Sequence, residues 1–253
     1  MVQQFLRKRA RILRGIYRTY MRGDCKSYEP GTWWDNTFFT KGLSDRHTMG
    51  PDTNPLAAAY HYASVELLIA RDLRNTGRDL TSCTICDLGS GSGHWIDFYL
   101  SLGASHCLGI DVSRKSVDFL RAKYKEREEV TIEHGRIHEV LALADSQYDL
   151  VNAIGIMFHV VDDEEWEETI RQVGRVLRAG GLFVVGGHFG LLDGVNVELS
   201  ESAVFKRLRS ASHWKRSLKQ AGFGRTRIYR NAAYRYIRAW MPENNVLITE
   251  KSS

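Results

Sequence analysis

A glycine-rich turn between two strongly patterned segments constrains this chain more than any other feature. Residues 85–95 read ICDLGSGSGHW: an apolar run ends near Asp87, glycine occupies every second position from Gly89 to Gly93, and a helical pattern begins. Because glycine has no Cβ, such a turn adopts positive φ and lets a ligand lie against bare backbone. The turn also directs the first free amides of the next helix toward that ligand. The pattern therefore predicts a binding loop between a strand and a helix.

The spacing of the glycines and the acid before them indicate the kind of ligand. A dinucleotide fingerprint reads G-x-G-x-x-G, whereas this run is G-x-G-x-G and has His94 where the third glycine is expected. Asp87 adds a fixed negative charge, which suits a cationic ligand better than a phosphate. S-adenosylmethionine carries a sulfonium and an ammonium, so the motif favours it over a dinucleotide. A plain tight turn would need fewer turn-type residues.

Length and composition predict a soluble globular protein. A chain of 253 residues can bury one sizeable core, with one domain and an appendage as the default. Its apolar fraction of 43% and charged fraction of 26% are ordinary for such proteins. No stretch approaches the roughly 20 apolar residues of a membrane span, and the N-terminus has no apolar run for a secretory signal. We therefore expect a cytoplasmic protein.

The cysteines predict no metal site. Cys83 and Cys86 form a C-x-x-C, but they fall at or within a predicted strand, where odd spacing sends side chains to opposite faces. No second pair completes a zinc site. Small buried thiols are the expected outcome.

Positive charge is unevenly distributed along the chain. The net charge is +5, and residues 1–22 contain seven Lys and Arg residues and no acid, while residues 203–238 are also basic. Such asymmetry points to an anionic partner: nucleic acid, a membrane surface or a phosphorylated substrate. Residues 1–22 also have helical apolar spacing. Packing on the domain or on a second subunit, as in a homodimer, is favoured for this helix over peripheral membrane contact.

Residues 27–55 have little periodicity and many aromatic side chains. A long irregular segment in a compact domain is usually a functional lid or a linker, and its aromatic density argues against disorder. We expect residues 1–55 to form an N-terminal basic helix and an aromatic cap, in front of a domain over residues 56–253. The plain alternative is a loop folded over the edge of a sheet without any ligand.

From residue 56 onward, helical and strand patterns alternate. Predicted helices are 56–75, 95–102, 113–127, 164–177 and 201–221, and predicted strands are 84–88, 107–110, 130–133, 148–153, 182–185, 225–229 and 246–249. Alternation of this kind implies an α/β fold, a doubly wound parallel sheet with helices on both faces. A binding site then lies at the carboxyl ends of the strands. The last two strands suggest a hairpin-like finish.

Four segments in order resemble class I S-adenosylmethionine-dependent methyltransferases of the Rossmann-like, small-molecule type. They are residues 85–93 (the glycine-rich motif), 109–113 (the second strand and its acidic end), 148–151 (the fourth strand) and 176–181 (the turn before the fifth strand). The resemblance implies a mostly parallel seven-stranded sheet with an antiparallel last strand. It also implies S-adenosylmethionine as methyl donor, S-adenosylhomocysteine as product, and no metal.

The resemblance also assigns donor-binding roles by position. Asp87 holds the donor ammonium, and Asp111 accepts from both ribose hydroxyls, because a carboxylate suits a cis-diol. Val112 lies against the adenine. The remaining expected donor contacts are Gly89, Ser90, Gly91, Gly93, Ala153 and Ile154.

One position departs from the family pattern. After the third strand the family often has Gly-Asp, whose acid receives the adenine amino group, but this chain has Gly135-Arg136-Ile137. An arginine cannot accept that hydrogen bond. Backbone groups of Ile137, or stacking by the plane of Arg136, are expected to substitute.

Candidate acceptor residues come from segments after the fourth and fifth strands and from the aromatic cap. His159 and His188 are the catalytic candidates, because a histidine near its pKa can take a proton as the methyl moves; the alternative is a packed histidine. Substrate-binding candidates are Trp33, Trp34, Phe39, His47, His159 and His188. The basic residues Lys206, Arg207, Arg209, Lys215 and Arg216 suggest an anionic acceptor, with a solvated helix face as the alternative.

The function most favoured by the sequence is methyl transfer to an oxygen or nitrogen of a small molecule. An RNA or protein methyltransferase that uses the basic surface is the first alternative, although no RNA-binding module is appended. The chain also reads Asn-Ala-Ile-Gly at residues 152–155, without the Asn-Pro-Pro-Tyr motif used on nucleobase amines. The second alternative is a non-catalytic protein that binds the donor.

Overall fold

The structure is a computed structural model that describes residues 29–49, 54–144, 147–190, 193–198, 205–231 and 244–252, with the side chains of 38–40, 195–198, 205 and 244 left undescribed. The basic helix predicted for residues 1–22, Cys25 and the side chain of Phe39 lie outside these described parts.

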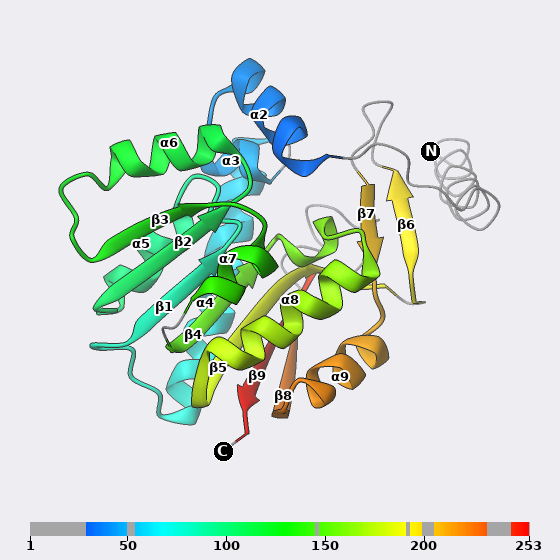
Figure 1. The fold of residues 1–253 in the computed structure, drawn as a ribbon. Coiled ribbons are helices and arrows are strands. Elements are labelled where there is room, and N and C mark those ends of the chain that lie inside the picture. Colours follow the sequence, from blue (N-terminus) through cyan, green and yellow to red (C-terminus); the bar gives the residue numbers. More distant parts are fainter. Residues whose placement is uncertain are drawn as a thin grey trace.

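A seven-stranded sheet forms the centre of the molecule, in the order β3-β2-β1-β4-β5-β9-β8 (Figure 1). Its strands are β1 (Thr84–Leu88), β2 (His106–Asp111), β3 (Val130–His134), β4 (Tyr148–Ile154), β5 (Leu177–His188), β8 (Phe223–Arg230) and β9 (Asn244–Lys251). Strands β1 to β5 are parallel, and β9 runs antiparallel to both β5 and β8. The predicted doubly wound sheet with an antiparallel last strand is confirmed.

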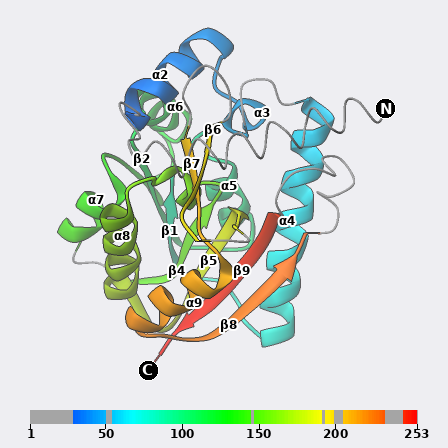
Figure 2. The ribbon, with the colours of Figure 1, turned by 90° about the vertical axis from the view of Figure 1, so that its right-hand side faces the viewer.

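Helices cover both faces of this sheet. On one face lie α4 (Pro55–Thr76), α5 (His94–Ser101) and α6 (Arg114–Lys123), and on the other lie α7 (Ile137–Leu143), α8 (Asp163–Val176) and α9 (Ala211–Gln220) (Figure 2). Two further helices, α2 (Pro30–Lys41) and α3 (Asp45–Thr48), lie beyond the carboxyl ends of the strands, at the top of Figure 1. A one-turn 3-10 helix, η1 (Met157–His159), follows β4, and a separate hairpin consists of β6 (Val195–Glu198) and β7 (Phe205–Leu208).

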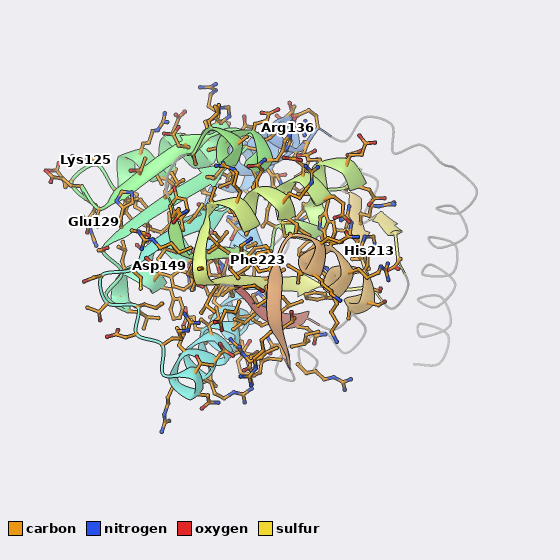
Figure 3. The ribbon with its side chains drawn as sticks, turned by 60° about the horizontal axis from the view of Figure 1, so that its bottom comes forward. Lys125, Glu129, Arg136, Asp149, His213 and Phe223 are labelled. Atoms are coloured by element: carbon orange, nitrogen blue, oxygen red, sulfur yellow. The ribbon has the colours of Figure 1, made fainter. Side chains whose placement is uncertain are left out.

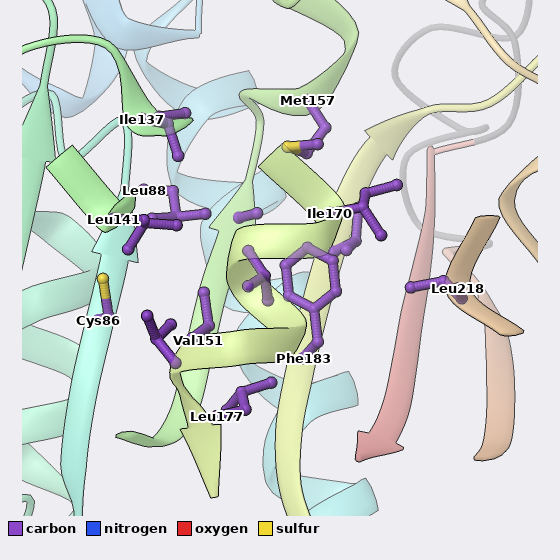
Figure 4. Packing of buried hydrophobic residues seen from close by; sticks show 14 of the residues in the cluster. Cys86, Leu88, Ile137, Leu141, Val151, Met157, Ile170, Leu177, Phe183 and Leu218 are labelled. Carbon is purple, nitrogen blue, oxygen red and sulfur yellow. The ribbon is translucent and has the colours of Figure 1, made fainter. Parts of the chain in front are cut away.

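Alternation along each strand divides the core into two clusters. Ile85 and Leu150 face the helices α4 to α6, whereas Cys86 and Val151 face α7 to α9. Figure 4 shows part of the second cluster, where Phe183 of β5 packs among side chains of α8 and its neighbours. Because consecutive strand residues point to opposite faces, strands buried on both sides read as continuous apolar runs.

Local sequence signals explain where the longest helix begins and ends. Asn54 precedes α4, and its side chain accepts a hydrogen bond from the amide of Leu56 at 2.9 Å. Pro55 occupies the first turn, where its missing N–H costs nothing. Gly77 ends the helix in the left-handed conformation at φ 64°, which glycine adopts readily.

Three sequence predictions about local structure are wrong. Residues 30–41 and 45–48 are helical although the aromatic segment was expected to be irregular, because contacts with the domain outweigh the weak local periodicity. The predicted turn at residues 179–181 lies within β5, beside a register irregularity of the β4–β5 pair. The predicted helix over 201–221 is a strand at 205–208 and a helix only from Ala211, because Ser210 caps α9 by accepting from His213.

Candidate functional site

Two aspartates and the glycine-rich loop meet at the carboxyl ends of β1 and β2. The Oδ2 atom of Asp111 accepts a hydrogen bond from the amide of Gly91 at 2.8 Å, and its Oδ1 atom accepts from the amide of Ser113 at 2.8 Å. The glycine loop after β1 is thereby attached to the end of β2. Asp111 thus does not cap α6 with its side chain, because Ser113 does so by accepting from Ser116.

Asp87 is fully enclosed and only half satisfied. Its Oδ1 atom accepts from the side-chain amide of Asn152 at 2.7 Å, its register neighbour on β4. Its Oδ2 atom is buried and meets no donor within the described ranges. Burial raises the pKa of Asp87 to about 7. A cation placed at Oδ2 would supply the missing partner and restore the ionised form.

Asn152 and Asp111 shape the charge of the same site. The sequence analysis did not identify Asn152 as a site residue. Its position was a usable signal, because an amide side chain within a buried apolar strand needs a hydrogen-bond partner. Its Oδ1 atom accepts from the hydroxyl of Tyr99 at 3.0 Å, which orients the amide toward Asp87. Burial also raises the pKa of Asp111 to about 6, although the amides of Ser113 and Gly91 oppose this shift.

Each glycine of the loop is closely approached by another part of the chain. A Cβ atom at Gly89 would lie 2.7 Å from Cγ1 of Ile156, and one at Gly91 would lie 2.8 Å from Cγ2 of Thr48. At Gly93 the neighbour is the hydroxyl of Tyr124, 2.5 Å from the position of a Cβ. Gly93 therefore makes room for Tyr124, while Ile156 and Thr48 line the loop at the other two glycines.

Helix α2 and Arg136 bound the side of the site formed by β2 and β3. Asp35 of α2 accepts from the hydroxyl of Ser113 at 2.6 Å. The guanidinium of Arg136 donates to Glu165 of α8 at 2.9 Å and lies 3.7 Å from Glu29. Figure 3 shows Arg136 at the end of the sheet opposite to Asp149. Arg136 thus connects the start of α7 with α8 and with the residue before α2.

The remaining residues predicted to contact the donor lie at or just after the carboxyl ends of the strands. Ile137 is buried at the start of α7, and the carbonyl of Val112 accepts from His134 at 3.2 Å. Ala153 and Ile154 are buried at the end of β4. Ser90 donates to the carbonyl of Asp87 at 3.0 Å.

An aromatic row brings four predicted acceptor residues together. The ring of Trp34 meets His159 edge-on, with ring centroids 5.5 Å apart. Phe158 contacts His159 at 4.5 Å on one side and His188 at 4.7 Å on the other. Trp33 packs edge-on against Trp34 at 4.5 Å. These contacts place Trp34 of the predicted cap beside the histidine after β4.

His159 has the properties of a neutral base. Its side chain is buried, and its Nδ1 atom has no hydrogen-bond partner in the described part of the chain. Burial, and next the charge of Lys206, lower the pKa of His159 well below its usual value. A neutral imidazole nitrogen without a donor can accept a proton.

The arginines of the predicted basic cluster form ion pairs, whereas one of its lysines, Lys206, is buried and the other, Lys215, is exposed. Arg207 and Arg209 both pair with Asp163, and Arg216 lies 3.3 Å from Asp193. Lys206 is buried and lies over the ring of Phe158, 4.6 Å from its centroid. His47 lies apart from the aromatic row in α3, where Nδ1 contacts the hydroxyl of Ser44 at 3.1 Å.

Comparison with known proteins agrees with this geometry. Residues 85–181, which span β1 to the start of β5, match the family model described as a methyltransferase domain. Over these residues the chain is similar to a methyltransferase domain. No curated protein sequence matches the chain closely enough to count as a relative.

Solved structures share the fold of this chain. The 1,6-didemethyltoxoflavin-N1-methyltransferase of Burkholderia thailandensis is 15% identical, with 90% of this chain and 92% of that chain covered and a TM-score of 0.62. Magnesium protoporphyrin IX methyltransferase of Synechocystis PCC 6803 is 18% identical, with 88% and 98% covered and a TM-score of 0.61. Both were solved with S-adenosylhomocysteine. The cyclase SpnF is 18% identical, with 74% and 80% covered and a TM-score of 0.58.

The described residues contain no group of three or more His, Cys, Asp or Glu side chains placed to hold a metal ion. None of the described helices combines the length and apolar character needed to cross a membrane.

Proposed function

We propose that the protein binds S-adenosylmethionine at the glycine-rich loop and transfers its methyl group to an oxygen or nitrogen of a small molecule beside His159. The observation that carries this proposal is the buried Oδ2 atom of Asp87, which lacks a donor among the described residues and lies one strand away from Asp111. The donor's ammonium supplies the partner that Asp87 needs. The solved neighbours that contain S-adenosylhomocysteine support the same ligand.

The chain's own residues fit the rest of this donor. A carboxylate offers about four lone-pair sites, and Asp111 uses one on each oxygen for the amides of Gly91 and Ser113. The remaining sites can accept from two ribose hydroxyls. Ile156 beside Gly89 and Thr48 beside Gly91 would exclude water from the methionine part.

Catalysis in this proposal depends on orientation and on one proton acceptor. The donor, when bound, supplies a methyl group already activated by the sulfonium. Trp34 and Phe158 form aromatic walls that would orient a planar acceptor for in-line attack. Nδ1 of His159 would receive the acceptor's proton; its lowered pKa keeps the imidazole neutral and also makes it a weaker base than an ordinary histidine.

Two alternatives make different predictions. The fold by itself does not determine the reaction, since a cyclase shares it, so the alternative of a donor-binding protein without methyl transfer now ranks ahead of RNA binding. Binding of RNA is less favoured, because Arg207, Arg209 and Arg216 are all engaged in ion pairs with acids of the chain. Incubation with isotopically labelled donor, followed by separate counting of small molecules, RNA and protein, distinguishes the three.

Calorimetry tests the donor site directly. S-adenosylmethionine and S-adenosylhomocysteine should both bind the wild type, and Asp111→Asn should weaken both by roughly 10-fold or more, as for loss of charge-assisted hydrogen bonds. Asp118→Asn is the matched control, because this carboxylate is exposed on the neighbouring helix α6. Absence of measurable binding to the wild type would refute the proposal.

A further inference from the structure

Helix α3 is held directly on the glycine-rich loop. Asp45 accepts a hydrogen bond from the hydroxyl of Ser92 at 2.5 Å. The methyl group of Thr48 lies 2.8 Å from the position that a Cβ atom would take at Gly91. The hydroxyl of Thr48 forms a hydrogen bond with the hydroxyl of Tyr62 at 2.8 Å. The N-terminal segment therefore forms a wall over the loop at the point where the donor's methionine part would lie.

A doubly bonded histidine anchors this wall. Nδ1 of His94, at the start of α5, lies 2.8 Å from Oδ2 of Asp45, and Nε2 lies 2.7 Å from Oε1 of Glu66 on α4. A neutral imidazole has only one N–H and cannot donate to two carboxylates at once. Both contacts are hydrogen bonds only when His94 carries its second proton, and the ring of Tyr62 stacks on it at 3.8 Å.

The surroundings of His94 favour the protonated form. Burial lowers the pKa of His94, but the hydrogen bonds and charges of Asp45 and Glu66 raise it by more, so that it lies above its usual value. The charged and titratable groups that face this contact are Asp45 and Arg46 of α3, Tyr62 and Glu66 of α4, Asp87 of β1 and Lys123 of α6. All of these groups except the buried Asp87 border a cleft of about 670 Å³, which His94 also lines.

Deprotonation of His94 would weaken the wall. One of the two carboxylates would lose its donor, and Asp45 and Glu66 would then repel each other without a cation between them. The ordinary pKa of an aspartate, 3.8, lies far below the pH at which His94 loses its proton, so Asp45 stays ionised there and cannot relieve the repulsion. The remaining bond from Ser92 to Asp45 is a weaker attachment for α3.

We propose that His94 is a positioning residue of the donor site, which as a cation joins Asp45 to Glu66 and so closes α3 over the glycine-rich loop. This inference rests on the proposed function, because it concerns the affinity for the donor and its product. Affinity for S-adenosylhomocysteine should fall as the pH rises through the pKa of His94. Ionisation of Asp87 and Asp111 acts in the opposite direction, so the binding profile should combine a rising limb from these carboxyls with a falling limb from His94.

The test is the dissociation constant of S-adenosylhomocysteine, measured by calorimetry from acid to alkaline pH on four proteins. In the wild type, affinity should fall about fivefold or more on the alkaline limb, which corresponds to the lower end of typical coupling energies between two sites. His106→Gln is the matched control and should show the same fall, because His106 begins β2 at the end away from Asp111. Near pH 6, His94→Gln should bind S-adenosylhomocysteine about fivefold more weakly than the wild type does. Its affinity should not fall further on the alkaline side. The ligand's own amino group titrates equally in all four.

Glu66→Gln separates positioning from a merely structural role. Loss of one flanking carboxylate should lower the pKa of His94, so the alkaline limb should move to lower pH, and the imidazole signals in an NMR titration should move with it. This arm decides the question if His94→Gln fails to fold. An alkaline limb that is unchanged in Glu66→Gln, or retained in a folded His94→Gln, overturns the inference. No binding to the wild type at any pH would instead refute the proposed function.

Discussion

The indole of Trp34 meets the imidazole of His159 edge-on, at 5.5 Å between centroids and with an interplanar angle of 85°. This contact joins the N-terminal helix α2 to the loop after β4. An edge-to-face pair of this kind contributes on the order of 1 kcal/mol beyond area burial. It therefore orients the proposed proton acceptor and closes one side of the acceptor site with the same side chain.

Replacement of His159 should separate catalysis from donor binding. We expect His159→Ala to slow methyl transfer to a hydroxyl acceptor by about 100-fold, as for loss of a general base. Its affinity for S-adenosylhomocysteine should stay within about twofold, because a substitution away from the bound ligand usually changes little. Transfer of labelled methyl groups to a panel of phenols and amines measures the first quantity. An unchanged rate would exclude His159 as the base.

Lys206 should set the pH at which His159 becomes active. Its charge helps to lower the pKa of His159, so the neutral imidazole persists to more acidic pH. In Lys206→Met that pKa should rise, and the acid limb of kcat/KM should move to higher pH. Lys215→Met, on the exposed face of α9, is the control and should keep the wild-type profile. A limb that stays in place in Lys206→Met would contradict this prediction.

The buried carboxyl of Asp87 should make stability depend on pH in a predictable direction. Between its ordinary value of 3.8 and its folded value of about 7, the unfolded chain has lost a proton that the folded chain keeps. The free energy of unfolding of the ligand-free protein should therefore fall as the pH rises through this window. A donor ammonium at Asp87 lowers its pKa, so stabilisation by S-adenosylmethionine should grow over the same window.

Thermal unfolding with and without S-adenosylmethionine across this window checks the Asp87 prediction. Asp87→Asn should flatten much of the dependence, and Asp111, with a pKa of about 6, should account for what remains. A ligand-induced shift in Tm that is equally large at both ends of the window would show that Asp87 does not respond to the donor.

A buried carboxylate far from the donor should matter for stability alone. Asp72 of α4 is fully buried and receives two hydrogen bonds from Arg227 of β8, at 2.6 Å and 2.9 Å. Because removal of one partner leaves the other charge unpaired, Asp72→Ala should cost about 3–5 kcal/mol in the free energy of unfolding. Lys125→Ala, in an exposed pair with Glu126, should cost less than about 1 kcal/mol. Urea titration compares the two, and equal losses would contradict the expectation.

Much of the fold could be read from local patterns. The strand at Thr84–Leu88 has the predicted bounds, and α4 differs from its predicted range by one residue at each end. Such elements are strongly periodic, and Asn54, Pro55 and Gly77 mark the ends of α4. The helix α7 was missed, since Ile137–Leu143 is only seven residues long and is held by packing against the neighbouring strand and α8.

Some residues of the candidate site could likewise be predicted from the sequence, and others could not. Asp87, Asp111 and the loop glycines were visible because their chemistry follows directly after strands. Thr48, Ile156 and Asn152 were not, because each reaches the site from a segment distant in sequence. The roles of the glycines also depended on their neighbours, since Gly93 makes room for Tyr124.

The order of strands, helices and glycines along the chain determined the class of fold and the edge of the sheet where a ligand would lie, because periodicity and backbone freedom are local properties. Only the tertiary structure decided that Trp34 contacts His159, that Asp87 keeps an oxygen without a donor among the described residues, and that His94 lies between two carboxylates. Burial and the proximity of charges depend on how distant segments pack. These two quantities in turn set the pKa values on which the proposed chemistry depends.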